Sequence, residues 1–333
     1  FIESSSITDR EVSLELVGLY LKQKYINKAS ILIEDLINVD PTDDNFIFRV
    51  AILCFDNQNY NLSEKYFNLL LSKFYSPDNI NFFLGQIDYQ NSRYEEALLH
   101  YNKIEYGTFV NTKISSMSKA ILKKDGIKKA LKYIDEEIKI KTKPDLLNLL
   151  ILKLSLYEED YKASEIINLT SEILKSFPTN QQALYSRALA YEKQGNISKM
   201  SEDFEKMINS DPYNSIALNA YGYSLTLQNS NLNFAEDLIR RAINIDPGNA
   251  AILDSLAWVL YNRGNYKDAY EYSSLAYSKD QDPEIIQHYY IILLKNGLVD
   301  EASSVLKKSV QDNPNDKNLL KLFESHDDEL FKL

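Results

Sequence analysis

The sequence predicts an all-α protein, a right-handed superhelical solenoid of about nine helical hairpins followed by a C-terminal capping helix. Three observations lead to this prediction: few turn-forming residues, evenly spaced prolines, and small residues that recur with the same period. The 333 residues include nine glycines and eight prolines, a scarcity that favours long helices over an all-β fold. A chain of this length is expected to divide into domains or to stack as repeats.

The prolines mark the joins between repeats. They fall at positions 41, 77, 144, 178, 212, 247, 283 and 314, with gaps of 36, 67, 34, 34, 35, 36 and 31 residues. Because proline is excluded from helix interiors but tolerated where a helix begins, its spacing measures the repeat, and 67 residues are about two repeats. We place the repeat starts near residues 10, 44, 78, 111, 145, 181, 215, 250 and 283.

Small residues recur within the repeats at the position where two helices must approach closely. The eighth position carries Ala51, Gly85, Ser118, Ala188, Gly222 and Ala257. Glycine recurs at the fifteenth position, where the chain turns between the two helices. We therefore expect the solenoid to occupy residues 10–316. Residues 1–9 are expected to form an N-terminal extension or the start of a cap, and residues 317–333 a capping helix and tail.

This pattern resembles the tetratricopeptide repeat, in both its period and its residue types. The clearest copies are residues 182–212 and the stretch LDSLAWVLYNRGNYKDAY at 253–270. The resemblance implies a scaffold for protein–protein interactions, with the first helix of each hairpin lining a concave wall.

The sequence contains no constellation typical of an enzyme. His100, His288 and His326 lie far apart and outside metal-ligand spacing, and Cys54 has no second cysteine with which to form a disulfide or a zinc site. HExxH, GxSxG and phosphate-loop motifs are absent. We predict no catalytic residues, no cofactor and no metal, and we expect His288 to pack between helices.

Charge and hydropathy narrow the classes of partner. The formal net charge of −11 disfavours non-specific nucleic-acid binding, which depends on clustered lysine and arginine. No run of 18 or more apolar residues is present, so we predict no transmembrane span in this sequence. The remaining expectation is one or more protein partners.

Positions 2, 5, 9 and 12 of each first helix recur on one face, which we expect to point into the concave groove. The candidate protein-binding residues on this face are Phe82, Gln86, Tyr185, Asn219, Tyr223, Asp254, Trp258 and Tyr261. Aromatic rings beside amides are typical of peptide-binding surfaces. The alternative interpretation is that the rings fill the contacts between successive first helices.

A second candidate surface is rich in lysine. Residues 119–143 hold nine lysines against four acids. One interpretation is a solvated helix face, and the other is a docking patch for an acidic partner. The candidate patch consists of Lys119, Lys123, Lys124, Lys128, Lys129 and Lys132.

The C-terminal third has a narrower resemblance. AYGYSL at 220–225, ILDSLAWVLY at 252–261 and DPEIIQHY at 282–289 resemble the terminal repeats of proteobacterial periplasmic tetratricopeptide lipoproteins. One type in that group binds and activates a carboxyl-terminal processing serine protease. The resemblance implies an outer-membrane-anchored adaptor that delivers substrates to such a protease. The sequence begins at Phe1 rather than methionine, so we expect any signal peptide or lipid anchor in a preceding segment.

Two alternatives remain open at this stage. The chain would equally suit an assembly factor for another envelope or cytoplasmic complex, such as a secretion, pilus or polysaccharide system. It would also suit the substrate-selecting module of a larger enzyme. In each case the repeats are the same and the bound partner differs.

Overall fold

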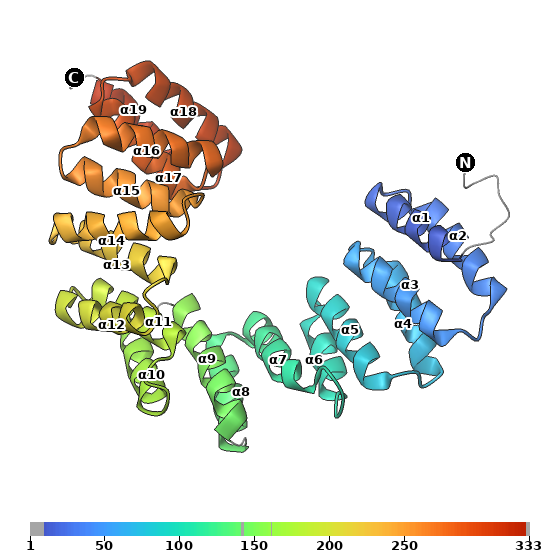
Figure 1. Cartoon of the computed structure of the whole chain (residues 1–333). Coiled ribbons are helices and arrows are strands. Elements are labelled where there is room, and N and C mark those ends of the chain that lie inside the picture. The colour runs from blue at the N-terminus through green and yellow to red at the C-terminus, as the bar shows by residue number, and fades with distance from the viewer. Residues whose placement is uncertain (1–9, 141–142, 161, 331–333) are drawn as a thin grey trace. The chain divides into compact units, whose positions relative to one another are not determined.

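The computed structural model describes residues 10–140, 143–160 and 162–330. In these ranges the chain forms nineteen α-helices and no strand (Figure 1), which confirms the predicted all-α class. The expected N-terminal extension at 1–9 and the last residues of the expected tail, 331–333, lie outside the described residues.

The odd-numbered helices are α1 (Arg10–Lys22), α3 (Asp44–Asp56), α5 (Pro77–Gln90), α7 (Val110–Asp125), α9 (Lys143–Glu159), α11 (Gln181–Lys193), α13 (Ser215–Leu227), α15 (Ala250–Asn262) and α17 (Pro283–Lys295). The even-numbered helices are α2 (Ile26–Val39), α4 (Tyr60–Ser72), α6 (Tyr94–Asn102), α8 (Ile127–Ile140), α10 (Ala163–Ser176), α12 (Ile197–Ser210), α14 (Leu232–Ile245), α16 (Tyr266–Lys279) and α18 (Val299–Asp312). A final helix, α19 (Lys317–Leu330), follows.

The odd-numbered helices begin at residues 10, 44, 77, 110, 143, 181, 215, 250 and 283, each within two residues of a start expected from the proline spacing. Local chemistry explains several of these starts. Pro77 and Pro283 open α5 and α17, where the missing N–H of proline costs no hydrogen bond. Asn180 and Asn214 cap α11 and α13 by accepting a backbone N–H from the first turn.

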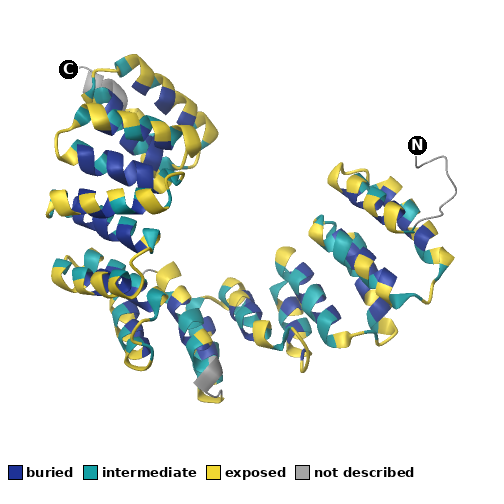
Figure 2. Ribbon diagram, viewed as in Figure 1, coloured by how far each residue is buried: buried dark blue, intermediate teal, exposed yellow. Residues whose placement is uncertain are grey.

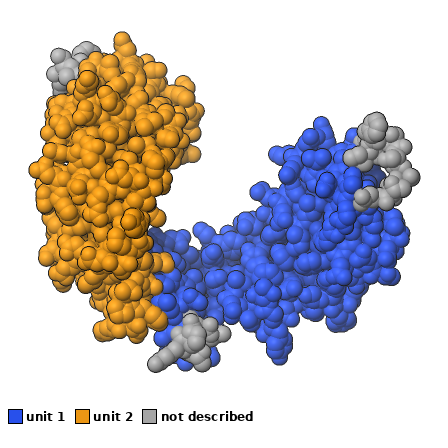
Figure 3. Space-filling view, viewed as in Figure 1, with its two compact units in different colours: residues 1–160 blue, residues 161–333 orange. Residues whose placement is uncertain are grey.

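The chain forms two compact units, residues 1–160 and residues 161–333 (Figure 3). In the first unit, α1 with α2, α3 with α4, α5 with α6 and α7 with α8 pack as hairpins. In the second unit, α11 with α12, α13 with α14, α15 with α16 and α17 with α18 do the same. The expectation of one continuous array without a second domain stays a prediction.

Buried residues lie on the helix faces that pack against other helices of the same unit (dark blue in Figure 2). Two glycines show why the eighth position of the repeat is small. A Cβ on Gly85 would lie 2.5 Å from the Tyr101 ring, and one on Gly222 would lie 2.6 Å from Ile239 Cγ1. Both distances are shorter than a carbon–carbon contact allows, so the close approach of the two helices requires glycine at these positions.

The cores differ in extent along the chain. A large cluster of buried residues around Phe204 and Leu256 extends from α11 to α17 in the second unit. A second large cluster fills α1 to α5 and includes Cys54, which is fully buried. Two further clusters in the remainder of the first unit, one around Tyr101 and one around Ile134, each contain few buried residues. No helix within the described ranges has both the length and the apolar character needed to cross a membrane.

Candidate functional site

Four of the predicted protein-binding residues lie close to one another in the second unit, together with His288. Tyr223 is on α13, Asp254, Trp258 and Tyr261 are on α15, and His288 is on α17. Helix α15 contacts both α13 and α17, so these side chains belong to three adjacent first helices. We call the five residues the Trp258 cluster.

The rings of this cluster form a stack. Trp258 stacks against His288 with ring centroids 4.1 Å apart and against Tyr261 with centroids 5.0 Å apart, both nearly parallel. Trp258 is half-buried, whereas His288 is 7% exposed. His288 therefore packs between helices, as expected from the sequence. Its position beside Trp258 was not predicted.

The His288 ring of this stack is hydrogen-bonded to an acid, Asp254. His288 Nδ1 donates to Asp254 Oδ2 over 2.7 Å, and Asp254 is 5% exposed. Burial raises the pKa of the Asp254 carboxyl, and the bond to His288 opposes that rise. The other carboxylate oxygen, Oδ1, is buried and accepts no hydrogen bond from any described residue. The 34 residues between Asp254 and His288 equal one repeat, and this period is the sequence signal that would have paired them.

A hydrogen bond crosses the cluster from α13 to α17. The hydroxyl of Tyr223 donates to Glu284 Oε1 over 2.5 Å. Burial raises the pKa of Tyr223, and the carboxylates of Glu284, Asp254 and Glu192 raise it further. The Tyr223 hydroxyl therefore stays protonated and acts as a donor among acids.

Asn219 lies on α13, one turn before Tyr223, and is half-buried. Its Oδ1 is a buried acceptor without a donor in the described part of the chain. Tyr185, the remaining predicted residue of the second unit, packs edge-on against the core residue Phe204 with centroids 6.2 Å apart. Asn219 therefore borders the Trp258 cluster, whereas Tyr185 contributes to helix packing.

The two predicted protein-binding residues of the first unit, Phe82 and Gln86, are not part of the Trp258 cluster, and each has its own surroundings. Phe82 stacks face to face on Phe109 with centroids 3.9 Å apart. Gln86 Nε2 donates to Ser116 Oγ over 3.2 Å. Gln86 also lines a 370 Å³ cavity together with Lys119 and Lys123. The ring of Phe82 thus serves helix packing, while Gln86 borders the lysine-rich surface.

The six lysines of the predicted docking patch are all exposed and lie on α7 and α8. Three of them approach acids: Lys124 Nζ lies 3.1 Å from Glu95, Lys129 Nζ 2.8 Å from Asp125, and Lys132 Nζ 3.9 Å from Glu136. Exposed pairs of this kind contribute little to stability. The patch is partly neutralised, and its role in docking stays a prediction.

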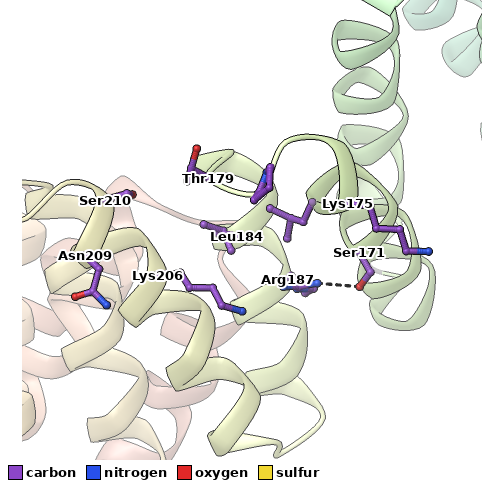
Figure 4. Close-up of a pocket in the computed structure, with 10 residues that line it drawn as sticks. Ser171, Lys175, Thr179, Leu184, Arg187, Lys206, Asn209 and Ser210 are labelled. Atoms are coloured by element: carbon purple, nitrogen blue, oxygen red, sulfur yellow. Dashed lines mark hydrogen bonds between the residues drawn. The ribbon is translucent and has the colours of Figure 1, made fainter.

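A cavity that the sequence did not predict opens between α10, α11 and α12, with a volume of 640 Å³ (Figure 4). Arg187 lies in its wall, donates to both carboxylate oxygens of Asp203 over 2.7 and 2.8 Å, and donates to Ser171 over 3.0 Å. The bidentate pair raises the pKa of Arg187 and neutralises its charge. This arrangement ties α10, α11 and α12 together.

The described residues provide no group of three or more His, Cys, Asp or Glu side chains that could hold a metal ion. The Trp258 cluster offers stacked aromatic rings and the Asp254 carboxylate, whose buried Oδ1 has no donor among the described residues.

Comparison with known proteins agrees with this fold. Residues 181–214 match the tetratricopeptide repeat family. A tetratricopeptide repeat-containing protein of Pseudomonas aeruginosa is 35% identical over 117 residues, which are 35% of this chain and 20% of that protein. The match thus spans about one fifth of the length of this curated relative.

Two solved structures are similar over most of their length. A tetratricopeptide repeat protein from Parabacteroides merdae has a TM-score of 0.58 at 15% identity, covering 75% of this chain and 98% of that one. The type IV pilus biogenesis factor PilW has a TM-score of 0.53 at 14% identity, covering 65% and 99%. The chain has the tetratricopeptide-repeat fold. Such repeats indicate a protein–protein interaction scaffold.

Proposed function

We propose that this chain is a non-catalytic adaptor that binds a partner protein through the Trp258 cluster and the adjoining Asn219. The observation that supports this proposal most strongly is a set of half-buried rings beside buried acceptors that have no donor among the described residues. A core would bury the rings completely and pair the acceptors, because unsatisfied buried acceptors cost free energy. A binding surface leaves both for its partner, and aromatic anchors are typical of such surfaces.

The partner that we propose is a carboxyl-terminal processing serine protease of the periplasm. In this proposal the chain is held at the outer membrane by a lipid anchor in a preceding segment. It activates the protease and presents substrates to it. The resemblance of residues 217–289 to periplasmic tetratricopeptide lipoproteins supports this choice.

Affinity capture from an envelope extract of the source organism tests the proposal. The immobilised chain is compared with a Tyr223→Ala, Trp258→Ala double variant, and retained proteins are identified by mass spectrometry. A Phe74→Ala, Tyr106→Ala double variant is the matched control, since both residues are exposed aromatics of the first unit (84% and 73% exposed). Circular dichroism establishes that all three proteins are folded.

The proposal predicts that the parent chain and the control retain the protease, and that the Trp258-cluster variant loses it. Retention of the protease by all three proteins would contradict the proposed binding site. Capture of pilus, secretion or polysaccharide assembly proteins in place of a protease would contradict the protease adaptor and favour an assembly factor.

A further inference from the structure

The Tyr223–Glu284 hydrogen bond joins two helices that are not successive first helices. Repeats of a solenoid ordinarily contact only their immediate neighbours, yet this bond of 2.5 Å connects α13 to α17 past α15. Asp254 lies on α15, the helix between them. Its charge acts on Tyr223, and the charge of Glu284 acts on Asp254, so the three side chains form one group.

This group is rich in acceptors and poor in donors. Asp254 is 5% exposed, and its Oδ1 finds no donor among the described side chains. We add Asn219 as a fourth member, because it lies one turn before Tyr223 on α13 and its Oδ1 is also buried and without a donor among the described residues. The carboxylates of Glu192 and Glu284 lie near enough to act on Tyr223. Buried acceptors left without donors are costly in a folded protein, so the unpaired oxygens of Asp254 and Asn219 point to a ligand that brings N–H groups. The nearby carboxylates point to a ligand that carries positive charge.

We propose that this group, made of Asn219, Tyr223, Asp254 and Glu284, binds the side chain of an arginine in an extended segment of the partner protein. The guanidinium displaces the Tyr223 hydroxyl from Glu284 and donates to the acceptors of the group. This inference rests on the proposed function, since it names the chemistry of the segment that the Trp258 cluster and Asn219 bind.

Arginine fits the group better than the other candidates. A metal ion is disfavoured because no group of three or more ligating side chains in the described ranges is arranged to hold one. An anion would face several carboxylates. A guanidinium presents five N–H donors in a planar fork and stays charged when it is partly buried. It can therefore satisfy acceptors that come from three different helices.

The fluorescence of Trp258 can report binding, because Trp258 is the single tryptophan of the chain. It stacks on the His288 ring, which is hydrogen-bonded to Asp254. The full chain is titrated with acetyl-Gly-Arg-Gly-amide while tryptophan fluorescence is recorded. The matched probe is acetyl-Gly-citrulline-Gly-amide, which keeps the shape of the arginine side chain and removes its charge. We expect a saturable change with the arginine peptide and an affinity at least about tenfold weaker for the citrulline peptide.

Two variants test the displacement step. Tyr223→Phe removes the hydroxyl that occupies Glu284, so we expect it to strengthen binding of the arginine peptide by about two- to tenfold. Glu284→Gln removes a charge at an exposed position and is expected to weaken binding by about tenfold or more. Glu271→Gln, at an exposed acid of α16, is the matched control and is expected to leave binding unchanged.

Equal binding of the two peptides, no saturable response to the arginine peptide, or an unchanged affinity of Glu284→Gln would each overturn the inference. Weaker binding by Tyr223→Phe would overturn the displacement step. These failures are distinct from failure of the proposed function. Arginine-selective binding without capture of a protease would leave the inference standing and remove the protease adaptor. Capture of a protease by a chain that does not bind the arginine peptide would support the protease adaptor and overturn the arginine inference.

Discussion

Trp258 is the residue at which the two interpretations of the aromatic positions separate. It stacks on His288 and Tyr261 but is half-buried, whereas Phe204 in the same unit is fully buried. The loss of free energy on truncation scales with the apolar area removed from water and the cavity left behind. The two residues should therefore respond differently to the same kind of substitution.

We expect Trp258→Ala to lower the free energy of unfolding by about 1–2 kcal/mol, and Phe204→Ala to lower it by about 3–5 kcal/mol. Urea denaturation followed by circular dichroism measures both. A Trp258→Ala variant that loses as much stability as Phe204→Ala would assign Trp258 to the core and leave the binding surface without its central ring.

Cys54 is a reporter of the first unit, because it is the chain's single cysteine and is fully buried. Burial raises the pKa of its thiol to about 12, so little reactive thiolate is present at pH 8. We expect an aromatic disulfide reagent to label native chain at a rate limited by unfolding and to label it at once in concentrated urea. Labelling of native chain at the rate of a free thiol would contradict the packing of α3.

At the scale of elements, the small eighth position sets how closely the two helices of a hairpin approach. Gly85 faces the Tyr101 ring, where a Cβ would lie at 2.5 Å, whereas a Cβ on Gly18 would meet Leu53 at 3.5 Å. Glycine in a helix otherwise costs about 0.5–1 kcal/mol relative to alanine. The same substitution should therefore have opposite effects at these two positions.

Gly85→Ala is expected to destabilise the chain by about 1–3 kcal/mol, because a ring must move to admit the methyl group. Gly18→Ala is expected to be neutral or to stabilise it by up to about 1 kcal/mol. Thermal unfolding monitored at 222 nm compares them. Equal shifts of the two midpoints would show that the closeness of the hairpin helices does not select glycine.

The sequence predicted the helical class, and the odd-numbered helices begin within two residues of the starts expected from the proline spacing, because the effect of proline on a helix start is local. Asp254 and Trp258 are four residues apart on α15, so helical periodicity places them on the same side of that helix. The role of this face in binding a partner stays a prediction. The stacking of His288 on Trp258 and the bond from Tyr223 to Glu284 were not predicted. Both depend on the angle between successive hairpins, which is fixed by packing over many side chains and not by any local spacing.

At the scale of the whole molecule, stability is expected to vary along the chain. The buried clusters around Tyr101 and Ile134 in the first unit are small, whereas the cluster around Phe204 is large. Local opening requires less free energy where fewer apolar contacts are lost. Helices α7 and α8 combine small cores with many exposed lysines.

We therefore expect brief digestion of the native chain with trypsin to cut first between Lys119 and Lys139, giving two large fragments. Mass spectrometry of the early products locates the cut. First cleavage at exposed lysines of α16, such as Lys267 or Lys279, would contradict this ranking of local stability.

The central claim is that the chain binds its partner through the Trp258 cluster and the adjoining Asn219, and site-specific photocrosslinking tests it most directly. A photoreactive amino acid replaces Gln287, which is half-buried on α17 next to His288, or Glu271, which is exposed on α16. Each protein is irradiated in envelope extract, and the adducts are identified by mass spectrometry. The account predicts a protease adduct from position 287 and none from position 271. An adduct from position 271 alone, or equal adducts from both positions, would contradict it.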